Sequence, residues 1–335
     1  MSTRNRLNIL IEPRSPGIII PLILGAFLWT FPYIFSNNYE LWPSQNTLFV
    51  TFINNLLDFN PFLSGVIGFL FTVLMGFLLV QLNKTYSFIR IRSLLLFFFY
   101  ILLIGTNISL HTFNFSQISS LFLLISLWQL FSIYDKKQSV IKTFNIGFFL
   151  AIGSFFSLEL LLFVPVFFIG IQRLKGLTSR TFLATCIGLL TPFVLFLSIA
   201  YLTDNNISAY ITSFFNQFQF GVELHYDYIS IAYLLTLLLT ALVSLLNILN
   251  NPFSDKIKVG RMLGFISLGF LFFVLLFFVK SNSLQIIFTL GTLFSTILYT
   301  HYFSLRPSIF TRIIFFLQII ICFIYYITSV FSLSL

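Results

Sequence analysis

Residues 143–172 read TFNIGFFLAIGSFFSLELLLFVPVFFIGIQ, an apolar run in which Glu159 is the one charged side chain. A straight helix of this length would measure about 45 Å, which exceeds the ~30 Å hydrocarbon core of a membrane. It would also place the basic residues before the run and those after it on opposite sides of the membrane, whereas basic residues favour the cytoplasmic side. We therefore predict a hairpin of two short helices, Thr143–Phe156 and Leu160–Gln172, with Glu159 at the apex. The flanking basic residues are Lys136, Lys137 and Lys142 before the run and Arg173, Lys175 and Arg180 after it.

The composition of the whole chain indicates the same environment. Of 335 residues, 58% are hydrophobic, 8% are charged and 48 are Phe, and the mean hydropathy is +1.01. A soluble domain could not bury this much apolar surface, so we expect an all-α polytopic membrane protein. The formal charge of +9 lies in short loops between apolar runs, where it sets topology rather than binding nucleic acid. Cys186 and Cys322 lie inside apolar runs, which favours neither a disulfide nor a metal site.

The order of apolar and polar runs predicts a single integral membrane domain, residues 1–335, with about eleven spans. Residues 1–16 form a cytoplasmic N-terminus before an uncleaved first helix, and residues 36–60 and 203–228 form the two larger external loops. In the first of these loops, Thr47–Leu57 could lie as an interfacial helix. Besides the hairpin, the predicted spans are Gly17–Phe35, Pro61–Leu82, Ser93–Leu110, Gln117–Tyr134, Thr181–Leu202, Ile229–Leu249, Met262–Val279, Leu284–Phe303 and Ile313–Leu335.

The distribution of charge supports this topology. Of the 18 Lys and Arg, only Lys280 falls outside, whereas six of the nine acidic residues do. Such an asymmetry is the positive-inside pattern, and it predicts a cytoplasmic N-terminus and an external C-terminus. Lys280 alone fixes the direction of the last spans.

Motifs for nucleotide hydrolysis, dinucleotide binding, zinc peptidase and serine hydrolase chemistry are absent from the sequence. Every acidic residue maps to a loop or an interface, which disfavours a proton- or ion-coupled carrier. The Phe-rich runs, such as Phe98–Tyr100 and Phe270–Phe278, are interpreted as lipid-facing or interhelical packing surfaces rather than as a cofactor site.

The candidate functional residues are polar groups that the topology places outside. Carboxylates at a membrane surface bind divalent cations or act as a general base, and an imidazole moves a proton or contacts a phosphate. Loop residues that are merely solvated are of the same types, so a functional role and a role as solvated surface both stay open. Glu159 differs, because a carboxylate inside SFFSLELLLF is costly unless something pairs with it. The candidates are Glu40, Asp58, His111, Glu159, Asp204, Glu223, His225 and Asp227.

Several stretches of the chain resemble parts of one known protein family. Two stretches resemble the second and fourth spans of GT-C glycosyltransferases: NPFLSGVIGFLFTVLMGFLLVQLNKTY (Asn60–Tyr86) and FSQISSLFLLISLWQLF (Phe115–Phe131). The hairpin resembles the short helix pair of these enzymes, and LLTPFVLFLSIAYLTDN (Leu189–Asn205) resembles the span that follows the pair. The resemblance covers about Pro16–Asn205. The whole chain is similar to a family of Bacteroidota-type inner-membrane proteins known only as a domain of unknown function.

The GT-C resemblance implies cell-envelope glycan assembly with a polyprenyl-phosphate-linked sugar. It implies that Glu40 or Asp58 is the catalytic acid or base of the first external loop. Tyr39 and Trp42, beside Glu40, are residue types that are common at the membrane interface, and they could stack on a sugar ring. A divalent cation would be a fitting cofactor. This chain departs from the family's pattern because the loop has no acidic pair and the outer face has one Lys and no Arg. A degenerate relative, a scaffold that binds other membrane proteins and a transporter or flippase therefore stay as alternatives.

Overall fold

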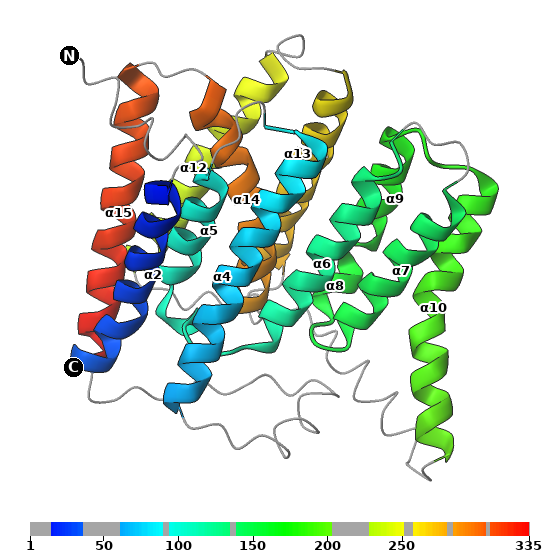
Figure 1. Ribbon diagram of the computed structural model, residues 1–335, viewed down its shortest axis with the longest axis horizontal. Coiled ribbons are helices and arrows are strands. Elements are labelled where there is room, and N and C mark those ends of the chain that lie inside the picture. The colour runs from blue at the N-terminus through cyan, green and yellow to red at the C-terminus, as the bar shows by residue number, and fades with distance from the viewer. Residues whose placement is uncertain are drawn as a thin grey trace.

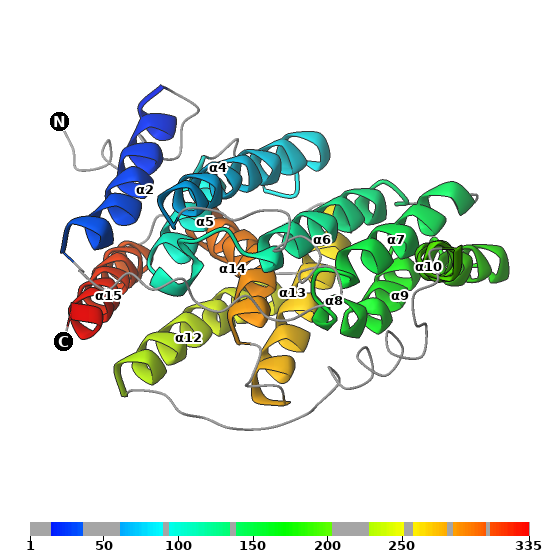
Figure 2. The ribbon, with the colours of Figure 1, turned by 90° about the horizontal axis from the view of Figure 1, so that it is seen from below.

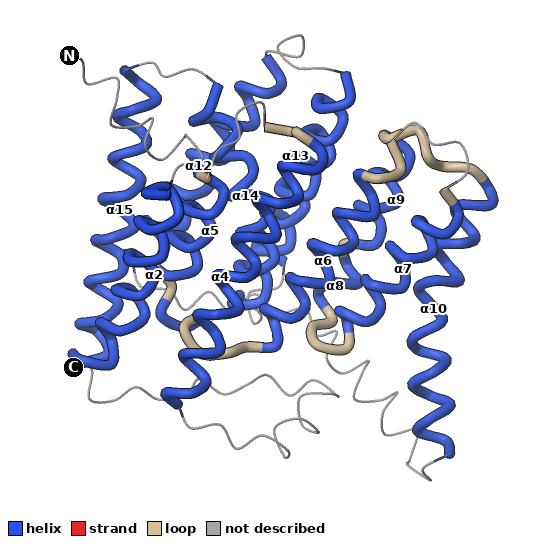
Figure 3. The backbone as a smooth tube through the Cα atoms, viewed as in Figure 1, coloured by secondary structure: helices blue, strands red, loops and turns tan. Residues whose placement is uncertain are grey.

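The computed structural model describes residues 15–35, 61–89, 94–134, 139–202, 228–250, 257–279, 284–305 and 309–334. These ranges contain helices and short connections and no strand (Figures 1 and 3). The helices are α2 (Ser15–Phe35), α4 (Pro61–Tyr86), α5 (Leu95–Gly105), η1 (Ile108–Leu110), α6 (Phe115–Phe131), α7 (Val140–Ser154), α8 (Glu159–Leu162), α9 (Val164–Arg173), α10 (Ser179–Leu202), α12 (Tyr228–Asn250), α13 (Ile257–Val279), α14 (Leu284–Leu305) and α15 (Ile309–Ser334).

The helices run up and down side by side, as a membrane bundle requires (Figure 1). A chain in lipid must satisfy its backbone hydrogen bonds within each helix, and these sequences are apolar around most of the helix circumference. The stretches long and apolar enough to cross a membrane are Phe62–Tyr86, Ser179–Leu202, Ile257–Phe277, Gln285–Ser304 and Ile309–Phe331. The all-α transmembrane class is thus confirmed, and the count of eleven spans stays a prediction.

The hairpin predicted from residues 143–172 is present. Helix α7 ends at Ser154, and the chain turns through Phe155–Leu158 and returns along α8 and α9 (Figure 1). The return leg differs from the single helix that we predicted, because it is divided at Phe163. Pro165 lies in the first turn of α9 and lacks the N–H that would continue the hydrogen bonds of α8. Two short helices therefore replace one.

Several other helix boundaries differ from the predicted ones, and two of these differences change the local structure. The third apolar run, expected as one helix to Leu110, ends at Gly105 and continues after Thr106 and Asn107 as η1. Helix α13 begins at Ile257, five residues before the predicted Met262, so that Lys258 and Arg261 lie on a helix rather than in a loop. Basic residues are compatible with this position because the end of a membrane helix reaches the polar interface.

Helices α5 and α14 form the centre of the bundle, between α4, α6, α12 and α13 (Figure 2). Every residue of α5 is buried, and in α14 the buried share of the span is 94%. The α14 span is also the least hydropathic of the five, because Thr and Ser recur along it. Burial explains this composition, since hydroxyls facing other helices are shielded from lipid. Helix α10 is the opposite case, with 22% of its span buried.

Candidate functional site

Most of the residues predicted to carry function lie outside the described ranges: Glu40, Trp42, Asp58, Asp204, Glu223, His225 and Asp227, together with the expected interfacial helix Thr47–Leu57. The helix ends that lead into the loop 36–60, and the end of α10 that leads into the loop 203–227, lie at the same end of the bundle as the hairpin turn (Figure 1). We call this the hairpin end. His111 and Glu159 are the two candidates that the structure describes.

His111 is fully buried in the connection between α5 and α6, so it is not the solvated loop side chain that the sequence left open. Its Nε2 lies 2.7 Å from the carbonyl oxygen of Gly105. A carbonyl can only accept, so Nε2 carries the proton and Nδ1 is left as an acceptor. Within the described ranges Nδ1 has no hydrogen-bond partner. Burial lowers the pKa of His111 to about 4, against the opposing effect of the Gly105 hydrogen bond.

The backbone of His111 is also engaged. Its carbonyl oxygen accepts a 2.9 Å hydrogen bond from the indole Nε1 of Trp29 on α2. Gly68 on α4 approaches the same carbonyl so closely that a Cβ there would lie 2.7 Å from the oxygen. Tyr326 on α15 faces the imidazole at 6.3 Å between ring centroids. His111 therefore joins α2, α4, α5 and α15, and the structure supports a neutral structural role for it more strongly than a catalytic one.

Glu159 is the first residue of α8 and is 5% exposed. It is the only acidic residue within the described ranges. The turn that carries it is held by packing of small and apolar groups, because Gly153 lies against the side chains of Leu160 and Phe122. His111 belongs to the α2–α4–α5 junction, whereas Glu159 belongs to the hairpin, so the structure places the two candidates in different parts of the bundle.

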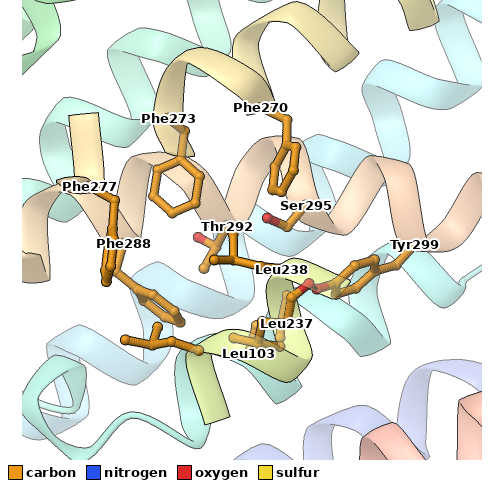
Figure 4. A pocket seen from close by; sticks show the side chains of 11 residues that line it. Leu103, Leu237, Leu238, Phe270, Phe273, Phe277, Phe288, Thr292, Ser295 and Tyr299 are labelled. Carbon is orange, nitrogen blue, oxygen red and sulfur yellow. Dashed lines mark hydrogen bonds between the residues drawn. The ribbon is translucent and has the colours of Figure 1, made fainter. Parts of the chain in front are cut away.

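A feature that sequence reasoning missed is a small apolar pocket, with a cavity of about 20 Å³, between α5, α12, α13 and α14 (Figure 4). The aromatic rings of α13 and α14 form one wall and leucines of α5 and α12 form the opposite wall. The lining residues are Leu103, Leu234, Leu237, Leu238, Phe270, Phe273, Phe277, Phe288, Thr292, Ser295 and Tyr299.

The polar atoms around the pocket are already satisfied by the protein. Tyr299 donates a 2.6 Å hydrogen bond to the carbonyl of Leu237, Thr292 donates to Thr289 at 2.8 Å and Ser295 donates to Gly291 at 3.0 Å. What these side chains offer to a ligand is hydrocarbon and aromatic surface. The cavity has room for about one methyl-sized group, so it is the character of its lining, and not its volume, that suits a flexible aliphatic chain.

The pocket lies toward the hairpin end. Leu103 is in the last turn of α5, Phe277 in the last turn of α13 and Phe288 in the second turn of α14, and these three helix ends lie at the hairpin end (Figure 1). The spacing of Phe270, Phe273 and Phe277 was visible in the sequence as one face of a helix. Such a stripe is equally typical of helix packing, so it did not predict a cavity.

Fold and pocket together define an all-α membrane bundle with an apolar pocket inside the helix layer. Comparison with protein-family models, curated proteins and solved structures finds no match for this chain.

Proposed function

We propose that the protein acts in cell-envelope biogenesis in the bacterial inner membrane, where it binds a polyprenyl-phosphate-linked sugar at the outer face. It acts there as a GT-C-like glycosyltransferase or as a degenerate relative that binds the carrier lipid without transfer. The observation that carries the proposal is the apolar pocket, because its hydrocarbon and aromatic lining is the kind of surface that an isoprenoid tail contacts when the helices part to admit it.

The position of the pocket also supports the proposal. Its lining residues lie toward the hairpin end, and the helix ends that lead into the acidic loop 36–60 lie at the same end (Figure 1). A lipid tail in the pocket would leave its phosphate and sugar at the hairpin end, where the helices that flank residues 36–60 also have their ends. Glu40 and Asp58 belong to that segment. In this arrangement Glu40 is the preferred general base, and a divalent cation between external carboxylates would neutralise the phosphate.

The pocket can be tested by filling it. Thr292 lines the pocket and its hydroxyl bonds only its own helix backbone, so Thr292→Phe adds volume without removing a partner from another helix. Thr191 on α10 makes the same kind of bond but is exposed, so Thr191→Phe is the matched control. We expect a photoactivatable polyprenyl phosphate to crosslink to wild type and to Thr191→Phe, and at least tenfold less to Thr292→Phe. Equal crosslinking of all three proteins would refute tail binding in this pocket.

A second function, a non-enzymatic subunit of an envelope complex, is favoured by α10. This helix packs against α7 and presents an outer surface of exposed apolar side chains, among them Leu183, Ile187, Leu190 and Val194. Such a surface fits another membrane helix as well as lipid. A partner that co-purifies in fixed ratio, and is lost when Ile187 and Leu190 are replaced by Trp, would favour the subunit over the enzyme.

A transporter or flippase is the third alternative and has the least support. A carrier for ions or protons needs ionisable groups along a path through the membrane. Among the described residues, Glu159 is the one buried side chain with a formal charge, and it lies at the hairpin turn.

A further inference from the structure

The opposite end of the bundle carries a cluster of cations on aromatic rings that the proposed function does not use. The Lys258 Nζ lies 5.7 Å from the ring centroid of Tyr86 and 5.9 Å from that of Tyr134. The Arg261 guanidinium carbon lies 5.7 Å from the centroid of Tyr134. Both cations come from one face of α13, three residues apart, and Tyr134 contacts both of them.

The aromatic rings beneath these cations are fixed in place. Tyr86, at the end of α4, donates a 3.0 Å hydrogen bond to the carbonyl of Trp128. Its ring packs edge-on against Trp128 and Phe131 of α6, with centroids 6.3 and 5.7 Å apart. Tyr134 follows α6 directly. The Tyr86 ring therefore has a defined position between α4, α6 and α13, and Tyr134 packs beside it against the core.

A third cation, from α9, contacts the next turn of α13. Arg173, the last residue of α9, donates a 2.9 Å hydrogen bond from Nη1 to the carbonyl of Gly264, which is three residues beyond Arg261. Gly264 permits this approach, because a Cβ there would lie 3.3 Å from Nη1. Lys258, Arg261 and the Gly264 carbonyl that Arg173 contacts thus follow one another at intervals of three residues along α13.

These charges are not neutralised by the described part of the chain. Glu159 is its one carboxylate, and it lies at the far end of the α8–α9 leg, fourteen residues and about 20 Å of helix rise from Arg173. Helix capping does not explain Lys258 and Arg261 either, because cations near a helix N-terminus are opposed by its dipole. Lys258 and Arg261 share the Tyr134 ring, and like charges placed in this way are stabilised when an anion binds to them.

We propose that Lys258, Arg261 and Arg173 form a binding site for the headgroup phosphate of an anionic phospholipid. The site lies where α4, α6 and α9 end and α13 begins, at the end opposite the hairpin turn (Figure 1), which the basic loops predict to be cytoplasmic. Basic pockets between helices on that side of a membrane recognise anionic headgroups. Ile257, 75% exposed beside Lys258, offers apolar surface to an acyl chain, which favours a lipid over free phosphate.

The test is native mass spectrometry of the purified full chain with phosphatidylglycerol or phosphatidylcholine. We expect wild type to retain phosphatidylglycerol selectively, and Lys258→Gln with Arg261→Gln to weaken its binding about 30-fold, since each basic residue contributes about fivefold. Lys175→Gln with Arg180→Gln removes the same charge from exposed residues near the same end and should leave binding unchanged. Lys258→Arg should also bind as wild type does.

Three results would overturn the proposal. An equal loss in the Lys175→Gln, Arg180→Gln control would mean that net charge alone attracts the lipid. Displacement of phosphatidylglycerol by millimolar inorganic phosphate would mean that the site recognises free phosphate. Unchanged binding in the Lys258→Gln, Arg261→Gln variant would exclude the site. If the double variant does not fold in phosphatidylcholine, Lys258→Gln alone is measured instead. It should bind phosphatidylglycerol about fivefold more weakly than wild type, and unchanged binding would likewise exclude the site.

Discussion

Trp29 and His111, 82 residues apart in the chain, stack with ring centroids 4.3 Å apart and planes inclined by 18°. The same indole donates a hydrogen bond to the His111 carbonyl oxygen, so one side chain holds both the ring and the backbone of the other. This pair fastens α2 to the connection between α5 and α6. It also keeps the imidazole away from water, which identifies His111 as part of the scaffold.

The Trp29 hydrogen bond is open to direct measurement. Trp29→Phe keeps an aromatic ring at the stack but removes the indole N–H, and leaves the buried His111 carbonyl with one donor fewer. We expect a loss of about 1–3 kcal/mol in unfolding free energy in detergent. Phe27→Leu, on the exposed side of α2, should cost well under that. If both substitutions lower the melting temperature equally, the hydrogen bond from Trp29 to His111 does not make the expected contribution to stability.

The stability of the protein should depend on pH through His111. Its pKa is lowered by burial to about 4 in the folded protein and is about 6.5 in the unfolded chain. Above pH 6.5 the imidazole is neutral in both states, and its contribution to stability is complete. As the pH falls toward 4 the unfolded chain takes up the proton first, so this contribution is lost.

Between pH 7.5 and pH 5 the loss attributable to His111 should be about 2 kcal/mol. His111→Gln cannot titrate, so it should lose less stability than wild type over the same interval, and the difference between the two proteins isolates this group. Unfolding in detergent at both pH values measures it. A pH dependence that is identical in wild type and His111→Gln would contradict a buried neutral imidazole.

The contact between α7 and α10 depends on two glycines. A Cβ on Gly147 would overlap the Thr185 carbonyl oxygen, and a Cβ on Gly188 would overlap the Phe144 carbonyl oxygen, so the two backbones touch. Small residues allow this close approach of helices in a membrane. Gly188→Val should therefore separate α10 from α7 and lower the melting temperature sharply. Gly260→Ala, where a Cβ meets no atom within 4 Å, should be tolerated.

The topology is tested by cysteine labelling in a chain whose native Cys186 and Cys322 are replaced by Ser. Positions 38, 215 and 138 are useful because they fall in the two loops predicted to be external and in one basic loop predicted to be cytoplasmic, all outside the described residues. We expect a membrane-impermeant reagent added from the outer side to label Asn38→Cys and Phe215→Cys. It should not label Gln138→Cys, and the reverse pattern would invert the predicted orientation.

Catalysis by residues 36–60, the loop predicted to be the first external one, has its own test. If Glu40 is the general base, Glu40→Gln should reduce turnover by about 10²- to 10⁴-fold while expression and folding stay normal. Asp58→Asn tests the other candidate in the same loop. Complementation of a deletion strain is the measurement. Full complementation by both variants would exclude catalysis at this loop and leave the scaffold function in its place.

The sequence alone was enough to establish the membrane class and the hairpin. Both follow from the composition of the chain and from the order of its apolar and basic residues. A chain with 8% charged residues cannot make a soluble surface. Basic residues on both sides of one long apolar run also require the chain to turn. The division of the return leg at Phe163 was not predicted, although Pro165 was visible as its cause.

Only the tertiary structure decided which apolar and polar side chains meet. Leu and Phe surround most of these helices, so hydropathy does not distinguish a face toward lipid from a face toward another helix. The stripe Phe270, Phe273 and Phe277 became one wall of a pocket because α12 and α14 pass beside it. Lys258, predicted in a loop, lies on a helix against Tyr86. His111 changed from a surface candidate into a buried junction because Trp29, 82 residues earlier, folds onto it, and no local pattern records a contact over that distance.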